Sequence, residues 1–303
     1  MKRNRIFAVL MAGVIAVGSL FVPTDTATAA RSTRPAPKSL AADSAIVMEL
    51  STGTVLYSKN IHRKHYPASI TKILTTLLTI ENCDLDAVHT FTYEEAHGIE
   101  MGSSSLYCVP GEKFTVEKML YGIMLQSANE MCLAAADEAA GTVDAFVDMM
   151  NQRVASLGLT DTHFANPNGL HDPDHYTTAY DIALMSRELI LNYPEIFEYS
   201  SIWMENITHV TRQGSKEFGL TNTNRLIRTY PGCIGLKTGS TSKAKFCLSA
   251  VAKKNNLMLI SVVMAAPDYK ARLKDAAALL DYGFARCSLY VDEEGVKLPT
   301  IPV

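Results

Sequence analysis

The pattern of hydrophobic and polar positions predicts strands at both ends of the chain and helices between them. Two short runs of β-type composition, 44–50 and 54–58, are joined by Ser51-Thr52-Gly53, which is a hairpin signal. Helical periods dominate 68–140, and 141–230 mixes helices with loops rich in Asn, Pro, Gly and Asp. The later elements are three apolar runs and a closing helix: 234–238, 246–252, 257–264 and 268–284.

This order of elements favours an α+β fold. We expect one antiparallel sheet built from the N- and C-terminal strands, flanked by helices, with a helical lobe formed by the middle of the chain. No internal repeat interrupts the pattern.

The N-terminus has the layout of a secretory signal peptide. Residues 1–30 combine a basic start, an uncharged run from Ile6 to Val22 and a small-residue site at Ala27-Thr-Ala29-Ala30. An uncleaved membrane anchor is the alternative, because the apolar run approaches spanning length. Either way, the rest of the chain is expected outside the cytoplasmic membrane. The predicted organisation is a signal peptide, a flexible leader, one catalytic domain and a short extension with no second domain: 1–30, 31–42, 43–288 and 289–303.

Composition narrows the function classes. Charged residues make up 19% of the 303 residues and the net charge is −3, so nothing indicates a nucleic-acid partner. The six cysteines could form up to three disulfides in an exported chain. A chain of this length does not need them to fold, and we expect mostly free, structural thiols. There is no CxxC or HExxH, so no metal or other cofactor is predicted.

The first candidate motif is Ser69-Ile-Thr-Lys72. Pro67 suits a helix start and an apolar stripe follows, so Ser69 is predicted in the first turn, where backbone N–H groups favour a developing oxyanion. Lys72 lies on nearly the same face and is the only charged residue between Lys64 and Glu81. Desolvation is expected to lower its pKa, so that a neutral amine acts as base. The alternative is an ordinary amphipathic helix whose lysine reaches solvent.

The second motif, Ser127-Ala-Asn129, lies where one helical stretch ends and another begins near Glu130. At such a junction the Ser127 hydroxyl could relay a proton to a leaving amine, and the Asn129 amide could hold a peptide carbonyl. Alternatively, one of the two side chains simply caps the second helix.

The third motif, Lys237-Thr-Gly239, is predicted on a strand that turns back after Ser240. Lys237 offers a positive charge for a substrate carboxylate, and Thr238 offers a hydroxyl beside it. Gly239 allows a ligand backbone to approach the strand. A plain edge strand with a solvated lysine is the alternative.

Together, in this order, the three motifs are a signature of penicillin-binding proteins and class A β-lactamases. From Ala45 to about Phe284 the chain resembles the low-molecular-weight penicillin-binding proteins, D-alanyl-D-alanine carboxypeptidases of the serine peptidase S11 family. The matching stretches are Tyr66-Pro-Ala-Ser-Ile-Thr-Lys72, Gly102-Ser-Ser-Ser-Leu106, Gln126-Ser-Ala-Asn129, Asn166-Pro-Asn-Gly-Leu170, Tyr176-Thr-Thr-Ala179 with Asp181, and Gly235-Leu-Lys-Thr-Gly-Ser240.

The resemblance implies the α/β sandwich of the serine β-lactamase and DD-peptidase type and a covalent mechanism. Ser69 would attack the penultimate D-Ala carbonyl of a peptidoglycan stem peptide with Lys72 as base, and Ser127 would help to protonate the leaving D-Ala. β-Lactams would acylate the same serine. The backbone N–H groups of Ser69 and Ser240 would form the oxyanion hole. The residues implied in binding the substrate are Lys237, Thr238, Gly239, Ser240 and Arg272.

The chain departs from the family pattern at three places. Glu130-Met131 follows the second motif, where an acidic residue and Ala are commoner. Asn168 stands where many relatives have His, so we assign nothing catalytic to Asn168. The chain stops at Val303, where many relatives continue into a second domain and an amphipathic anchor. The sequence therefore gives no support for C-terminal membrane attachment.

Two other functions compete with the carboxypeptidase. A β-lactamase needs a carboxylate that activates water, and Glu188-Leu-Ile-Leu-Asn192 has the required pattern. It lies farther after Asn129 than the pattern of class A β-lactamases allows, and it falls inside a predicted helix. We therefore interpret Glu188 as a solvated helix residue. The other competitor is a non-catalytic module that senses β-lactams or binds the wall. The complete set of expected catalytic side chains argues against it, and endopeptidase action on crosslinks stays open.

Overall fold

The computed structural model describes residues 36–37, 39–211, 213–291 and 297–300, all in one compact unit, Ser32–Val303. The predicted signal peptide, 1–30, lies outside the described residues. Within the described part, no helix is both long and apolar enough to cross a membrane.

A five-stranded antiparallel sheet forms the centre of the fold, in the order β2-β1-β9-β8-β7. It combines the two N-terminal strands with three C-terminal ones, as predicted. Its strands are β1 (Ser44–Glu49), β2 (Val55–Lys59), β7 (Cys233–Thr241), β8 (Lys245–Lys254) and β9 (Leu257–Ala266). β1 pairs with β9 over its whole length, which closes the sheet between the two ends of the sequence.

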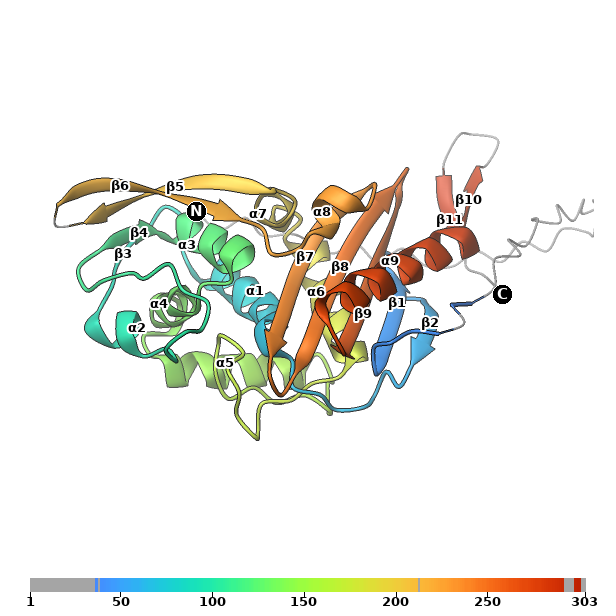
Figure 1. The fold of residues 1–303 in the computed structure, drawn as a ribbon, viewed down its shortest axis with the longest axis horizontal. Helices are drawn as coiled ribbons and strands as arrows, with labels where there is room; N and C mark the ends of the chain where they lie inside the picture. The colour runs from blue at the N-terminus through green and yellow to red at the C-terminus, as the bar shows by residue number, and fades with distance from the viewer. Residues whose placement is uncertain (1–35, 38, 212, 292–296, 301–303) are drawn as a thin grey trace, which may run out of the picture. The chain divides into compact units, whose positions relative to one another are not determined.

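Both faces of this sheet are buried. The closing helix α9 (Tyr269–Arg286), capped by Asp268, crosses one face, while α6 (Ala179–Asn192) covers the other (Figure 1). Neighbouring residues of β1 point into different cores: Ile46 packs on the α6 side and Val47 on the α9 side. Because neither face is solvated, the strands are nearly continuous apolar runs.

The middle of the chain forms the predicted helical lobe beside the sheet (Figure 1). A 3₁₀ turn (Ala68–Thr71) precedes α1, and a π-helical turn (Gly122–Gln126) separates α3 from α4. The helices not yet named are α1 (Lys72–Asn82), α2 (Tyr93–His97), α3 (Val116–Tyr121), α4 (Asn129–Ala140), α5 (Val143–Ser156), α7 (Ile196–Ser200) and α8 (Leu226–Thr229).

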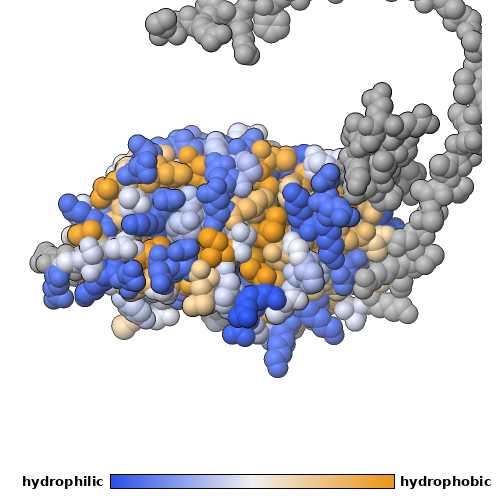
Figure 2. Space-filling model, turned by 90° about the horizontal axis from the view of Figure 1, so that it is seen from above, coloured by the Kyte–Doolittle hydropathy of each residue, from blue (hydrophilic) through white to orange (hydrophobic). Residues whose placement is uncertain are grey.

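A second, four-stranded sheet in the order β3-β4-β5-β6 corrects the prediction of helices and loops alone between the terminal strands. Its strands are β3 (Val88–Thr90), β4 (Lys113–Thr115), β5 (Met204–Thr211) and β6 (Gly214–Thr221). Most of β6 is exposed, so the hairpin of β5 and β6 shows no apolar alternation in the sequence. Figure 2 looks onto the face that carries this hairpin and shows hydrophobic side chains lying between hydrophilic ones.

The ends of the described part also differ from the prediction. Leu40 and Ala42, placed in the flexible leader by their sequence, are buried, and the Ala42 N–H donates to Asp275 on α9. Near the C-terminus, β10 (Ser288–Val291) and β11 (Lys297–Thr300) pair as a two-stranded antiparallel sheet. All six cysteines are free, as expected.

Candidate active site

Ser69 lies in the 3₁₀ turn that leads into α1, one turn earlier than the first turn of the α-helix itself. The preceding residue, Ala68, has φ 51°, a left-handed conformation that costs a non-glycine residue about 1–2 kcal/mol. Gly169 packs directly against the Ala68 carbonyl, since a Cβ on this glycine would lie 2.0 Å from that oxygen. The nucleophile turn is therefore held in an unusual backbone conformation by the loop beside it.

A buried hydrogen-bond path supports the same turn. The Thr71 hydroxyl donates to the Ala68 carbonyl at 2.9 Å and lies 2.8 Å from Nε2 of His175. Nδ1 of His175 accepts from the Ala165 N–H, so the proton is on Nε2 and Thr71 is the acceptor. Burial lowers the pKa of His175 to about 3, which keeps the ring neutral. Nothing in the sequence pattern indicated this support.

Lys72 is completely buried, and its amine lies 3.1 Å from Ser69 Oγ. It donates to Asn129 Oδ1 at 2.7 Å and to the Asn168 carbonyl at 2.5 Å. Burial lowers the pKa of Lys72, although Cys132 and Glu130 oppose the shift. The alternative of a lysine that reaches solvent is excluded. Asn168 takes part through its backbone, a contribution that its side chain does not reveal in the sequence.

Ser127 and Asn129 flank the junction between the π-helical turn and α4. The N-cap of α4 is Ala128, which makes no side-chain capping bond, so neither residue serves as a cap. Ser127 has φ 63° and its Oγ is buried without a hydrogen-bond partner in the described part of the chain. A buried hydroxyl without a partner is costly, and it indicates a group that awaits a ligand or a transferred proton.

The third motif lies on β7, directly beside the nucleophile turn. A Cβ on Gly239 would lie 2.9 Å from the Ser69 nitrogen and 2.8 Å from the Pro67 carbonyl, so only glycine permits this approach. Lys237 is buried, which excludes the solvated alternative, and burial followed by the charge of Lys72 lowers its pKa well below the ordinary value. The Thr238 hydroxyl lies 2.7 Å from that of Thr223, which the sequence did not single out.

Arg272 reaches the same place from α9. Its guanidinium is almost fully buried and donates to the carbonyls of Gly239 and Cys247, both at 3.3 Å. Its Nε is buried without a partner among the described residues. Tyr269 and Phe246 place their rings within 5.6 Å of the guanidinium carbon.

These side chains surround one cavity of about 470 Å³. Ser69, Ser127 and Thr238 line it, and Lys72, Asn129 and Lys237 are buried behind its wall. The other lining residues are Ser104, Gln126, Trp203, Thr221, Asn222, Thr223, Arg225, Gly239, Ser240, Phe246, Tyr269 and Arg272. The structure therefore brings together all nine residues that the sequence singled out.

None of the described residues that line this cavity carries a carboxylate. Glu188 lies on α6 and forms an ion pair with Arg153 at 3.7 Å, so it is not placed to activate a water molecule at Ser69. Among the residues that the structure describes, no group of three or more His, Cys, Asp or Glu side chains could hold a metal ion.

Comparison with known proteins identifies the same family from a family model and from individual relatives. The family model for D-alanyl-D-alanine carboxypeptidases, peptidase S11, matches residues 30–268. The chain is 41% identical over 251 residues to the D-alanyl-D-alanine carboxypeptidase DacF of Bacillus subtilis, covering 81% of this chain and 62% of DacF. It is 34% identical over 258 residues to DacA of Escherichia coli K12, covering 82% and 62%. The chain thus spans less than two thirds of the length of these relatives.

Solved structures are similar as well. The crystal structure of the Streptomyces K15 DD-transpeptidase matches with a TM-score of 0.79 at 30% identity, covering 83% of this chain and 100% of the other. The D-alanyl-D-alanine carboxypeptidase DacD of Francisella tularensis matches with a TM-score of 0.77 at 28% identity, covering 85% and 74%.

Proposed function

The chain belongs to the D-alanyl-D-alanine carboxypeptidases of the serine peptidase S11 family, and on that premise we propose that it removes the terminal D-alanine from peptidoglycan stem peptides through an acyl-Ser69 intermediate. One observation carries the proposal: the buried Lys72 amine lies 3.1 Å from Ser69 Oγ.

The hydrogen bonds of Lys72 fit a neutral base. A neutral amine has two N–H donors and one lone pair, whereas an ammonium group has three donors. Asn129 Oδ1 and the Asn168 carbonyl can only accept, so they use both N–H groups. The lone pair is then left for the Ser69 hydroxyl. The lowered pKa of Lys72 favours the same protonation state.

Acylation follows from this arrangement. As Ser69 Oγ bonds to the carbonyl carbon of the penultimate D-Ala, its proton passes to Lys72. The backbone N–H groups of Ser69 and Ser240 would stabilise the oxyanion, since β7 passes beside the turn at Gly239. The C–N bond then breaks, and the proton reaches the leaving D-Ala amine through Ser127. Water later attacks the ester carbonyl while Lys72 takes the water's proton. As the ester C–O bond breaks, this proton passes to Ser69 Oγ, which releases the shortened peptide and restores the free hydroxyl.

The cationic end of the cavity suits the terminal carboxylate of the substrate. Thr238 and Arg272 line the cavity, and Lys237 is buried next to Thr238. Charge-assisted hydrogen bonds from these groups would hold a carboxylate more strongly than neutral donors would. β-Lactams carry the same combination of an acylating carbonyl and a carboxylate, so we expect them to acylate Ser69.

The proposed substrate also determines where the protein acts. Peptidoglycan stem peptides lie outside the cytoplasmic membrane, so residues 43–288 would work there as the catalytic domain. The predicted signal peptide, 1–30, would direct the export, a leader would end before the buried Leu40, and 289–303 would be a short extension.

The test is release of D-alanine from diacetyl-Lys-D-Ala-D-Ala by the purified protein. Wild type should release it, and Ser69→Ala should lose activity by several orders of magnitude while keeping its fold. Ser156→Ala, at an exposed serine on α5, is the matched control and should be unaffected. Covalent penicillin labelling without release of D-Ala would contradict the proposal in favour of a sensor. Rapid, repeated hydrolysis of a chromogenic cephalosporin would contradict it in favour of a β-lactamase.

A further inference from the structure

A second cavity, larger than the first, lies between the loop 98–112 and the hairpin of β5 and β6. We call it the distal pocket. Its volume is about 920 Å³. It is lined by Tyr93, His97, Leu106, Tyr107, Val109, Pro110, Glu112, Gln213, Lys216, Glu217 and Phe218. Nothing in the proposed reaction at Ser69 uses these residues.

The two cavities share both walls. On the loop 98–112, Ser104 lines the Ser69 cavity and Leu106 lines the distal pocket. On β6, Thr221 lines the first and Phe218 the second. At about 3.3–3.4 Å per residue, the distal pocket begins about 10 Å along β6 from Thr221, and Lys216 lies about 17 Å away.

The loop wall is fixed to the second motif and the start of α4 where it meets the Ser69 cavity. The Asn129 N–H donates to the Ser104 carbonyl at 2.9 Å. Next along α4, the buried carboxylate of Glu130 accepts from Ser105 Oγ at 2.8 Å and from the Leu106 N–H at 2.5 Å. Glu130 therefore holds the stretch of loop between the two cavities.

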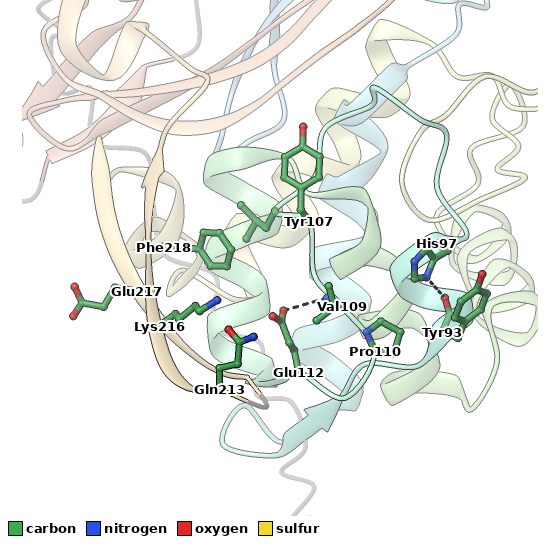
Figure 3. A pocket seen from close by; sticks show the side chains of 11 residues that line it. Tyr93, His97, Tyr107, Val109, Pro110, Glu112, Gln213, Lys216, Glu217 and Phe218 are labelled. Carbon is green, nitrogen blue, oxygen red and sulfur yellow. Dashed lines mark hydrogen bonds between the residues drawn. The ribbon is translucent and has the colours of Figure 1, made fainter.

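The lining of the distal pocket combines aromatic faces with polar groups (Figure 3). Tyr107 is 82% exposed and has φ 58°, so the loop holds a large ring in solvent at a cost in backbone energy. Tyr93 is also exposed and stacks on His97, with ring centroids 4.3 Å apart. Figure 3 shows Lys216 pointing from the hairpin toward Glu112 on the loop.

Such a lining suits a sugar better than an ion. A pyranose ring presents C–H groups on its faces, which pack on aromatic rings, and hydroxyl groups at its edge, which bond to amide, carboxylate and ammonium groups. The charged residues that line the pocket are one lysine, Lys216, and two glutamates, Glu112 and Glu217. Because both signs of charge are present, the lining does not select an ionic ligand of one sign.

We propose that the distal pocket binds the N-acetylated amino sugar to which a stem peptide is attached, while the D-Ala-D-Ala end of the same molecule lies at Ser69. This inference rests on the proposed function and identifies its substrate as the sugar-bearing peptide rather than the peptide alone. Along β6, the distance from Thr221 in the Ser69 cavity to Phe218 and Lys216 in the distal pocket equals the length of about three to five extended residues. This is the length of a stem peptide.

The experiment compares three substrates: diacetyl-Lys-D-Ala-D-Ala, a free pentapeptide stem, and the same stem carrying its amino-sugar disaccharide. In wild type the sugar should raise kcat/KM about tenfold over the free stem. Tyr107→Ala should remove most of this gain and leave the two sugarless substrates unchanged. Tyr107→Phe should keep the gain, because the ring remains. Met101→Ala, at an exposed residue of the same loop that does not line the pocket, is the matched control.

An equal kcat/KM for the stems with and without sugar would overturn the inference, and so would a gain that Tyr107→Ala leaves intact. An equal gain from a second sugarless stem peptide would show that the pocket takes peptide instead. If no substrate releases D-Ala, the proposed function fails separately. Titration of the disaccharide alone, followed by NMR, then decides the inference: binding that weakens in Tyr107→Ala supports it, and no binding overturns it.

Discussion

The two sides of the nucleophile turn differ in how far the protein satisfies its own polar groups. On the side of the loop 163–177, the Lys72 amine and the Ala68 carbonyl both have protein partners. On the side of the Ser69 cavity, which both residues line, Ser127 Oγ and Arg272 Nε are buried without partners in the described part of the chain. The first side fixes the reacting groups before substrate arrives, and the second leaves its hydrogen-bonding capacity for the substrate.

The two buried lysines show the same contrast. Burial lowers the pKa of both Lys72 and Lys237. The Lys72 amine has three oxygen neighbours within hydrogen-bond distance, whereas the Lys237 amine donates one bond among the described residues, to the Thr238 carbonyl at 3.2 Å. Equal burial thus serves two purposes: one lysine is prepared as a base, and the other is prepared for an anion that the substrate brings.

The largest effect is expected from removing the base. Lys72→Ala should lower the acylation rate at least about a thousandfold, and Lys72→Arg should do the same, because a guanidinium stays protonated. In wild type the rate should rise with pH through the lowered pKa of Lys72, since only the neutral amine accepts the proton of Ser69. Stopped-flow acylation by a β-lactam between pH 5 and 10 measures both, and an unchanged rate in Lys72→Arg would contradict the assignment.

The next largest effect is expected on the side of the loop 163–177, where the protein satisfies its own polar groups. Gly169→Ala would force a Cβ against the Ala68 carbonyl, whereas Gly141→Ala, at a similar φ, meets nothing within 4 Å. An alanine with a left-handed backbone is strained in both variants. The difference between their unfolding free energies therefore reports the contact with the Ala68 carbonyl alone. Gly169→Ala should be about 2–3 kcal/mol less stable than Gly141→Ala, with a Tm roughly 4–10 °C lower, and less active. Equal Tm values by calorimetry would show that the contact does not constrain the turn.

On the side of the Ser69 cavity, Lys237→Met should lower kcat/KM for a D-Ala-D-Ala peptide by roughly 10- to 100-fold. This factor corresponds to the free energy of one charge-assisted hydrogen bond. In wild type, amidation of the peptide's C-terminus should lower kcat/KM by the same factor. In Lys237→Met, amidation should cause no further loss of kcat/KM. Because the pKa of Lys237 is lowered, preference for the acid over the amide should fall as pH rises. Lys253→Met, at an exposed lysine on β8, is the control and should keep the preference.

The smallest effect concerns the path from His175 to the turn. Thr71→Val removes the hydroxyl between His175 and Ala68 and leaves a buried N–H without a partner, which costs about 1–3 kcal/mol. kcat should fall about tenfold with little change in KM, and Thr71→Ser should restore it. A proportionate rise in KM would instead place the effect on substrate binding.

The main sheet could be predicted from the sequence because both of its faces are buried. β7, β8 and β9 appear as apolar runs bounded by polar turns, and the predicted ranges fall within the observed strands. The second sheet could not be predicted, since β6 is mostly exposed and follows no period. The pairing of β5 with β4 depends on tertiary contacts that hydrophobic patterning does not encode.

The candidate site divides in the same way. The side chains of Ser69, Lys72 and Lys237 belong to recognisable motifs, so their types and spacing could be read directly. The Asn168 carbonyl and the neutral His175 ring could not, because a backbone acceptor has no residue type and a buried histidine resembles any other in sequence. The parts that sequence reasoning missed are those that orient the motif residues.

The most direct test of the account is to locate the bond that a β-lactam forms. After incubation with benzylpenicillin, the protein should gain the mass of one penicilloyl group, and peptide mapping by mass spectrometry should place it on Ser69. Ser69→Ala should gain none. Modification at any other residue, or an unmodified wild-type protein, would contradict the claim that Ser69 is the nucleophile activated by Lys72.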